Sequence, residues 1–292
     1  MRVGFRLGHT AAMTKASVTD LLRIAPGPVL LRSHDPRATP GFSGNKAAGK
    51  RALAEFGEQI SDLQERLYAE GHSGGVRSVL IVLQGMDTSG KGGVVRHVAG
   101  LLDPQGVQIA SFKAPTAAER ARGFLWRIRQ RVPGPGMIGI FDRSHYEDVL
   151  IARVRKLAAP STIANRYESI NHFEADLVDD GTSVLKCFLH ISASEQRDRL
   201  MARLDDPTKH WKFNSGDIDE RARWNDYQSA YEVGLERCNT EVAPWLVIPS
   251  DRKWYRNWAI TRILLEHLTM LDPRWPPADF DVAEQKARLG AT

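Results

Sequence analysis

The segment with the clearest chemical signature is Gly85-Met-Asp-Thr-Ser-Gly-Lys-Gly92, which directly follows the apolar run at 79–83. A buried strand that leads into a glycine-rich turn, a lysine and then a helix is the arrangement of a phosphate-binding P-loop. Gly85 and Gly90 would let backbone N–H groups converge on an anion, and Lys91 would reach the terminal phosphates. The motif therefore predicts a site for a phosphorylated substrate.

One position of this loop departs from the usual pattern. The residue after Lys91 is Gly92, where ordinary P-loop nucleoside triphosphatases carry the Ser or Thr that ligates magnesium. Asp87 lies inside the loop, where a carboxylate repels phosphate unless a cation bridges the two or the carboxylate handles a proton. We therefore expect Asp87 to bind a metal ion or to orient the attacking oxygen. The alternative is an exposed acidic residue without a role.

A second carboxylate ends another predicted buried strand, in Phe141-Asp142-Arg143-Ser144. An aspartate at the carboxyl end of a strand beside the P-loop strand is well placed to organise magnesium. Arg143 could neutralise the charge of a phosphoryl group during its transfer. Asp142 could instead only end the strand and cap the next turn, but the presence of the P-loop favours the metal.

Cationic side chains also gather around a helix break at Pro207, and these are Arg199, Arg203, Lys209 and Lys212. The two arginines stand four residues apart, on one face of a helix. In P-loop kinases a mobile cationic lid between two late helices closes over the phosphates. The alternative is a solvated loop that Trp211 anchors to the core.

Hydrophobic patterning predicts the elements that must position these residues. Strand-like apolar runs occupy 77–84, 107–112, 137–142, 184–191 and 245–249, and helical stretches separate them. A helical period also covers about 46–70, as an N-terminal arm. Capping boxes predict further helix starts, at Thr116–Glu119, Ser144–Glu147 and Ser192–Glu195. The alternation indicates an α/β fold, with a parallel sheet of about five strands and helices on both faces.

We divide the chain into three parts: an irregular N-terminal extension over 1–44, a single domain over 45–272 and a peripheral tail over 273–292. Prolines and glycines mark the first part, and Pro273, Pro276 and Pro277 close the last helix. The lid would cover about 199–216. Met13 is a plausible alternative start of the chain.

Composition places the chain among ordinary soluble proteins. Of its 292 residues 42% are hydrophobic and 26% are charged. No apolar run has the length of a transmembrane helix or of a secretory signal, so we expect no membrane partner. Cys187 and Cys238 have neither metal-like nor redox-like spacing, and we expect reduced thiols in a cytoplasmic protein.

The positive charge is concentrated in one segment. Residues 113–131 contain six basic side chains and the single acid Glu119. The net charge of this segment therefore equals the net charge of the whole chain, +5. This segment is either a solvated helix face or an electropositive wall beside a polyanion site.

Ten ordered strings between about residues 35 and 272 resemble the polyphosphate kinase 2 family. Among them are Leu-Gln-Gly-Met-Asp at 83–87, Gly-Lys-Gly at 90–92, Ser-Phe-Lys-Ala-Pro at 111–115, Asp-Arg-Ser-His-Tyr-Glu-Asp-Val-Leu at 142–150, Lys-His-Trp-Lys-Phe at 209–213 and Asp-Arg-Lys-Trp at 251–254. The resemblance implies a P-loop kinase-like three-layer sandwich with a helical lid. It also implies phosphoryl transfer between inorganic polyphosphate and nucleotides, with Mg²⁺ or Mn²⁺.

The resemblance implies a role for each matching position. Asp87 and Asp142 would hold the metal, and Lys91 and Arg143 would bind the phosphates that are exchanged. The remaining phosphate contacts would come from Gly85, Gly90, Gly92, Lys113, Arg199, Arg203, Lys209 and Lys212. Glu147 and Asp148 would lie near the acceptor nucleotide, although each could also serve only the start of a helix.

Partners and alternatives follow from the same comparison. The implied substrates are polyphosphate and adenine or guanine nucleotides (AMP or ADP, and GDP), with no nucleic acid, in a homo-oligomer such as a dimer or tetramer. Many relatives have Asn at the position of Asp142, and several have Asp at that of Gly92, which leaves open whether a monophosphate, a diphosphate or both accept the phosphoryl group. The first alternative is an ATP-dependent nucleoside monophosphate kinase, against which Gly92 argues. The second is a non-enzymatic polyanion-binding module built on 113–131, against which the paired carboxylates argue.

Overall fold

A computed structural model describes residues 16–292. One sheet of five strands forms its centre, in the order β2-β3-β1-β4-β5, and every neighbouring pair is parallel. The strands are β1 (Ser78–Gln84), β2 (Val107–Ser111), β3 (Ile138–Asp142), β4 (Thr182–His190) and β5 (Trp245–Pro249). The five apolar runs of the sequence are therefore confirmed as strands.

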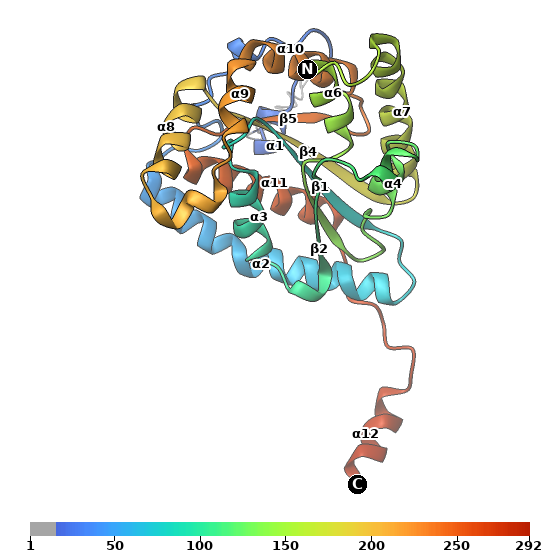
Figure 1. Cartoon of the computed structure of the whole chain (residues 1–292). Helices are drawn as coiled ribbons and strands as arrows, with labels where there is room; N and C mark the ends of the chain where they lie inside the picture. Colours follow the sequence, from blue (N-terminus) through green and yellow to red (C-terminus); the bar gives the residue numbers. More distant parts are fainter. Residues whose placement is uncertain (1–15) are drawn as a thin grey trace, which may run out of the picture.

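Helices cover both faces of the sheet, so the molecule has three layers (Figure 1). Alternate residues of β1 show why: Val79, Ile81 and Leu83 join one apolar cluster, whereas Leu80 and Val82 join the other. The first cluster packs against α2 (Lys46–His72), α3 (Lys91–Ala99) and α11 (Lys253–Leu271). The second packs against α7 (Pro160–Asp179) and α10 (Trp224–Arg237). The predicted α/β three-layer architecture is confirmed.

Shorter helices surround this framework. They are α1 (Val18–Leu22), η1 (Leu31–Ser33), η2 (Pro104–Gly106), α4 (Ala117–Arg120), α5 (Trp126–Arg129), η3 (His145–Asp148), α6 (Ile151–Val154), α8 (Ala193–Leu204), η4 (Pro207–Lys212) and α9 (Gly216–Ala222). The basic segment 113–131 is thus two single-turn helices and not one continuous basic helix. Cys187 and Cys238 are both free and buried, as predicted.

The N-terminal segment is more ordered than its sequence suggested, as far as it is described. The irregular structure expected over 1–44 is wrong for Val18–Leu22, because Ser17 and Asp20 form a capping box that starts α1. Ile24 N–H then donates to Trp245 O at 3.1 Å, which attaches the segment to the β5 edge. Helix α2 is likewise no separate arm, since it packs along α11 as part of one layer. The alternative start at Met13 lies outside the described residues.

Two of the three predicted capping boxes need correction. The Thr116–Glu119 box is present. At Ser192 the hydroxyl accepts from Glu195 N–H as predicted, but the Glu195 carboxylate accepts from Arg199 instead of returning to the cap. Ser144 caps Tyr146 N–H at the start of a 3₁₀ turn, so Glu147 is not used in a box and is free to face a cavity.

The chain ends in a segment that leaves the body of the molecule. Helix α12 (Val282–Gly290) lies well away from the three layers, at the end of an extended stretch (Figure 1). Phe280, Val282 and Leu289 are exposed on this arm. Over residues 16–292, no helix combines the length and the apolar composition that a bilayer crossing requires.

Candidate active site

The predicted P-loop connects the end of β1 to the start of α3. Gly90 has φ +108°, and a Cβ added there would lie 1.7 Å from Arg256 Nη1, so this position requires glycine. No side chain of the described residues caps α3, which leaves its first N–H groups for a ligand. Lys91 is buried, and its Nζ donates to Gly85 O at 2.7 Å and to Met86 O at 3.3 Å. Burial lowers the pKa of this lysine, although Asp87 opposes the shift.

Two buried arginines donate to carbonyl oxygens of this loop. Arg199 of α8 donates from Nη1 to Thr88 O and Ser89 O, at 2.8 and 3.1 Å, and from Nη2 to Ser250 O and Asp251 O. Its Nε donates to Glu195, so all five N–H donors of the guanidinium are occupied by protein oxygens. Arg199 therefore clamps the loop, which differs from the expected contact with a phosphate chain from the lid side.

Arg256 of α11 is the second clamp, and sequence analysis missed it. Its Nη1 donates to Ser89 O at 2.9 Å, and its Nη2 donates to Asn257 Oδ1. Burial and the neighbouring Arg199 lower the pKa of Arg256 to about 9. Two like charges side by side behind the loop favour an anion in front of it. The string at 251–254 marks this segment, but only the fold brings Arg256 under Gly90.

The two predicted metal ligands come from the P-loop and from the end of the neighbouring strand β3. Asp142 ends β3 opposite Leu83 of β1, and Asp87 forms an ion pair with Arg143 at 3.1 Å. Asp87 and Asp142 line one groove, together with Lys91 and Gly92. A Cβ at Gly92 would meet only Asp142 Oδ2, at 4.0 Å, so the missing side chain leaves open space before this carboxylate.

This pair of carboxylates suits a hard cation that keeps other oxygen ligands. Among residues 16–292 no group of three His, Cys, Asp or Glu side chains converges on a metal position. Mg²⁺ typically binds one or two carboxylates and takes its other ligands from water and substrate phosphates. The residues present therefore fit Mg²⁺ or Mn²⁺ in the presence of a phosphorylated substrate.

Three adjoining cavities meet at Arg143. We call the first, of about 770 Å³, the cationic groove; it is lined by Lys91, Arg96, Lys113, Arg203, Lys212, Lys253, Arg256 and the exposed Trp211, among others. The second, of about 340 Å³, lies between the P-loop and α9 and is lined by Asp87, Glu147, Arg155, Asp217, Glu220 and Tyr231, among others. The third, of about 490 Å³, is lined by Phe112, Phe124, Arg122, Arg127, Asp148 and Arg166, among others. Arg143 lines all three, and so connects a polycationic surface with a mixed apolar and polar cavity.

The two carboxylates after Arg143 differ in their surroundings. Glu147 lines both the second and the third cavity, and burial raises its pKa despite the nearby Arg143 and Lys91 charges. Burial also raises the pKa of Asp148, while Arg166 and Arg127 oppose that shift from 3.9 and 3.8 Å. Glu147 and Asp148 therefore both line the third cavity, and their proximity to a nucleotide stays a prediction.

The lid cations are distributed less simply than predicted. Arg203 and Lys212 line the groove, and Arg203 pairs with Asp217 at 3.3 Å. Lys209 pairs with Asp206 at 2.5 Å and is not among the lining residues of the groove. Trp211 is 77% exposed, so the alternative in which it anchors a loop to the core is wrong.

A contact between α9, which directly follows the predicted lid, and the body of the molecule was not predicted from the sequence. Glu220 of α9 accepts from Arg155, which follows α6, and from Tyr227 Oη of α10. We call these three side chains the lid latch. No spacing rule relates residues 65 positions apart, so no sequence pattern could have revealed this pair.

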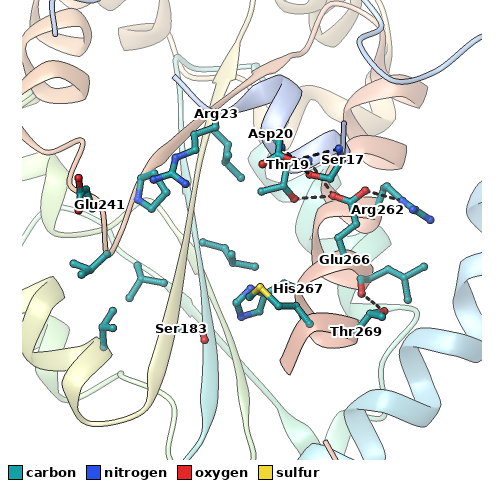
Figure 2. Close-up of a pocket in the computed structure, with 18 of the residues that line it drawn as sticks. Ser17, Thr19, Asp20, Arg23, Ser183, Glu241, Arg262, Glu266, His267 and Thr269 are labelled. Carbon is teal, nitrogen blue, oxygen red and sulfur yellow. Dashed lines mark hydrogen bonds and ion pairs between the residues drawn. The ribbon is translucent and has the colours of Figure 1, made fainter. Parts of the chain in front are cut away.

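A larger cavity lies elsewhere and has a different character. It measures about 880 Å³ and lies at the amino ends of β4 and β5, between α1 and the end of α11 (Figure 2). The Glu266 carboxylate on its wall is already occupied by Thr19 and Arg262. None of the predicted site residues lines this cavity, so size alone would have misplaced the active site.

The chain is similar to several known proteins. Residues 43–276 match the family model described as Polyphosphate kinase 2 (PPK2). The chain is 48% identical over 255 residues to the AMP/ADP-polyphosphate phosphotransferase of Meiothermus ruber, covering 87% of this chain and 94% of that protein. It is 40% identical to the ADP-polyphosphate phosphotransferase of Rhodopseudomonas palustris, over 75% of this chain and 78% of that one. The crystal structure of Polyphosphate Kinase 2 from Arthrobacter aurescens TC1 superposes with a TM-score of 0.92 at 49% identity, and covers 95% of this chain and 98% of its own.

Proposed function

The chain belongs to the polyphosphate kinase 2 family, and on that premise we propose that it is a polyphosphate-dependent nucleotide kinase that phosphorylates AMP and ADP. The observation that carries the proposal is the position of Arg143, at the junction of the cationic groove with the two smaller cavities. A relative 48% identical is named for AMP and ADP, which supports both acceptors. A relative 30% identical is named for GDP, and we propose GDP as a weaker third acceptor.

The groove suits a donor that carries negative charge on every unit. Lys212 and Arg203 come from the lid, whereas Lys253 comes from α11, so cations face the groove from both sides. The third cavity suits a nucleotide, because Phe112 and Phe124 offer aromatic surface beside several arginines. The acceptor phosphate would then point toward Arg143.

Asp87 and Asp142 would hold Mg²⁺ or Mn²⁺, in the open space before Gly92. A divalent cation bound there would draw the reacting phosphate oxygens together and offset their charge.

The chain itself supplies position and charge. The N–H groups at the start of α3 hold the terminal donor phosphate, and Lys91 exchanges its contacts with Gly85 O and Met86 O for phosphate oxygens. Arg143 contacts the phosphoryl group as it moves between donor and acceptor, and the lid excludes water that would otherwise accept it. Little proton transfer is needed, because the acceptor phosphate is already an anion.

Assembly and location belong to the same proposal. We propose a homo-oligomer, a dimer or a tetramer, in the cytoplasm. The projecting α12, with its exposed apolar side chains, supports an oligomer, because an isolated nine-residue helix gains little stability in water without a packing partner.

The test is incubation of purified protein with polyphosphate, Mg²⁺ and either AMP or ADP, followed by anion-exchange chromatography. We expect ADP from AMP, and ATP from ADP, only when polyphosphate is present. Asp87→Asn and Asp142→Asn should keep the fold and lower turnover by about 100-fold or more, because each removes a metal ligand. Asp62→Asn, at an exposed position of α2, is the matched control.

Two outcomes would contradict the proposal. Phosphorylation of a nucleoside monophosphate by ATP, with none from polyphosphate, would make the protein an ordinary nucleotide kinase. Binding of polyphosphate without any transfer would make it a polyanion-binding module. Near-normal turnover in both aspartate variants would refute the metal assignment.

A further inference from the structure

A fully buried ion pair lies in the core behind the turn that carries Arg143. Lys186 of β4 donates from Nζ to Glu174 Oε2 at 2.6 Å, to Cys238 O at 2.6 Å and to Tyr146 Oη at 3.0 Å. These contacts use all three protons of the ammonium group. Lys186 and Glu174 are each 0% exposed, so neither charge is solvated by water. One side chain thereby connects a central strand, α7, the end of α10 and the turn η3.

The other carboxylate oxygen of Glu174 holds the turn itself. Tyr146 Oη donates to Glu174 Oε1 at 2.8 Å, and His145 Nε2 lies 3.1 Å from the same oxygen. Because a carboxylate oxygen can only accept, His145 carries a proton on Nε2. Both side chains of this turn that enter the core thus end on Glu174.

The chain alternates between core and site at this turn. His145 and Tyr146 point into the core, whereas Arg143 and Glu147 on either side of them line the cavities of the candidate active site. Arg143 also has φ +66°, a backbone conformation that a residue with a side chain adopts only when its surroundings impose it. The inward contacts therefore fix the outward side chains.

Stability alone is a poor reason for such a pair. Moving two charges out of water costs free energy that their attraction often fails to recover, and apolar replacements of buried pairs are commonly tolerated. Such a cluster fixes the positions of its side chains better than apolar side chains would, because its hydrogen bonds have defined directions.

We propose that Glu174 and Lys186 are positioning residues for phosphoryl transfer: they hold His145 and Tyr146 so that Arg143 and Glu147 face the reacting phosphates. The proposal rests on the polyphosphate-dependent kinase activity proposed above. It assigns to two core residues an effect on turnover, without contact with either substrate.

The test compares three variants with the wild-type protein. The double variant Glu174→Leu with Lys186→Met removes both charges together, and with them the oxygen that accepts from Tyr146 and His145, so no unpaired buried charge remains. Tyr146→Phe removes one hydroxyl and is the milder change, which keeps the test decisive if the double variant does not fold. Leu268→Ala, in the core on the opposite face of the sheet, is the control for loss of stability alone.

Kinetics and unfolding are measured together. We expect kcat to fall about 10- to 100-fold in the double variant and to a smaller extent in Tyr146→Phe, since small misplacements of catalytic groups have effects of this size. The KM for polyphosphate should change little, because the cations that line the groove lie on other elements, apart from Arg143. Leu268→Ala should keep its kcat even if its melting temperature falls further. Unchanged kcat in the folded double variant, or an equal loss in Leu268→Ala, would overturn the proposal.

Hydrogen exchange of backbone amides separates this proposal from the proposed function. We expect faster exchange over 143–149 in the double variant, and unchanged exchange over the P-loop at 85–93. If the wild-type protein transfers no phosphate from polyphosphate, the proposed function fails, but the exchange rates still show whether the pair holds the turn. Equal exchange at 143–149 in both proteins would refute that role.

Discussion

At the scale of single residues, the loop glycines have different reasons to be glycine. Gly90 leaves room for Arg256, whereas Gly92 borders open space before Asp142. Glycine thus permits a close contact with Arg256 at position 90 and leaves space before Asp142 at position 92.

This difference predicts unequal effects of one substitution. Gly90→Ala should destabilise the protein by about 1–3 kcal/mol, because the new methyl group meets Arg256 and the backbone has φ +108°. Gly92→Ala is the matched control and should fold with a nearly unchanged free energy of unfolding. Urea unfolding of both variants measures the difference, and equal stabilities would contradict the assignment.

Glu147 gives a prediction about pH. Burial raises the pKa of its carboxyl above the usual 4.5. A carboxyl group whose pKa is higher in the folded state stabilises that state while the group is protonated. This contribution is complete below about pH 4.5 and is lost as the pH rises through the folded-state pKa. Glu147→Gln is neutral at every pH, so it should be more stable than the wild-type protein at about pH 7 and equal to it at about pH 4.

Urea unfolding at both pH values measures this effect. Glu65→Gln, on the exposed side of α2, is the control for loss of one negative charge. A stability gain that is the same at both pH values would show that burial of the Glu147 carboxylate is not the cause. We also expect lower activity at neutral pH, because Glu147 borders two of the three cavities that meet at Arg143.

The candidate site residues that the sequence revealed belong to short sequence motifs. The residue that it missed is brought to the site only by the tertiary fold. Asp87, Lys91, Asp142 and Arg143 belong to short strings, and the fold brings all four to one place. Arg256 has no motif of its own, because its role depends on α11 passing behind the P-loop. Arg199 was singled out from its charge, but only the fold reveals that protein carbonyl and carboxylate oxygens occupy its donors.

At the scale of elements, strand boundaries could be read closely because buried parallel strands are continuous apolar runs. Short helices were harder to predict. The 3₁₀ turn at 145–148 carries a sequence typical of a capping box, but the burial of His145 and Tyr146 decides its shape. Tertiary contacts thus override the local preference at the turn that carries Arg143.

The lid latch is the feature of this scale that can be tested directly. Glu220→Ala should loosen α9 from the body and lower kcat/KM by about two- to fivefold, the usual size for a partly exposed ion pair. Asp219→Ala, exposed on the same helix, is the control. Steady-state kinetics with both substrates measure the effect, and equal values for the two variants would show that the latch does not affect lid closure.

At the scale of the whole molecule, basic side chains from several elements gather at the cationic groove. Basic side chains from the P-loop helix, the segment after β2, the lid and α11 converge on one groove, although the net charge is only +5. The basic side chains of segment 113–131 contribute to two cavities instead of forming a uniform basic helix.

This arrangement predicts a selective effect of salt. Raising the ionic strength from about 0.05 to about 0.5 M should increase the KM for polyphosphate several-fold more than the KM for the nucleotide, because screening acts on many charges at once for the longer anion. Initial rates at several salt concentrations measure both constants. Parallel increases would indicate that the groove does not carry the donor.

The attachment of α8 to the P-loop has a consequence for how such enzymes can diversify. Gln196 and Arg199 bind the loop carbonyl oxygens, whereas the break at Pro207 begins only after the helix ends at Leu204. Mutations, insertions or deletions between 205 and 215 can therefore alter the lid while the half of α8 that supports the loop stays in place. Natural selection, or a designer, could retune the length of phosphate chain that is accepted without rebuilding the catalytic centre.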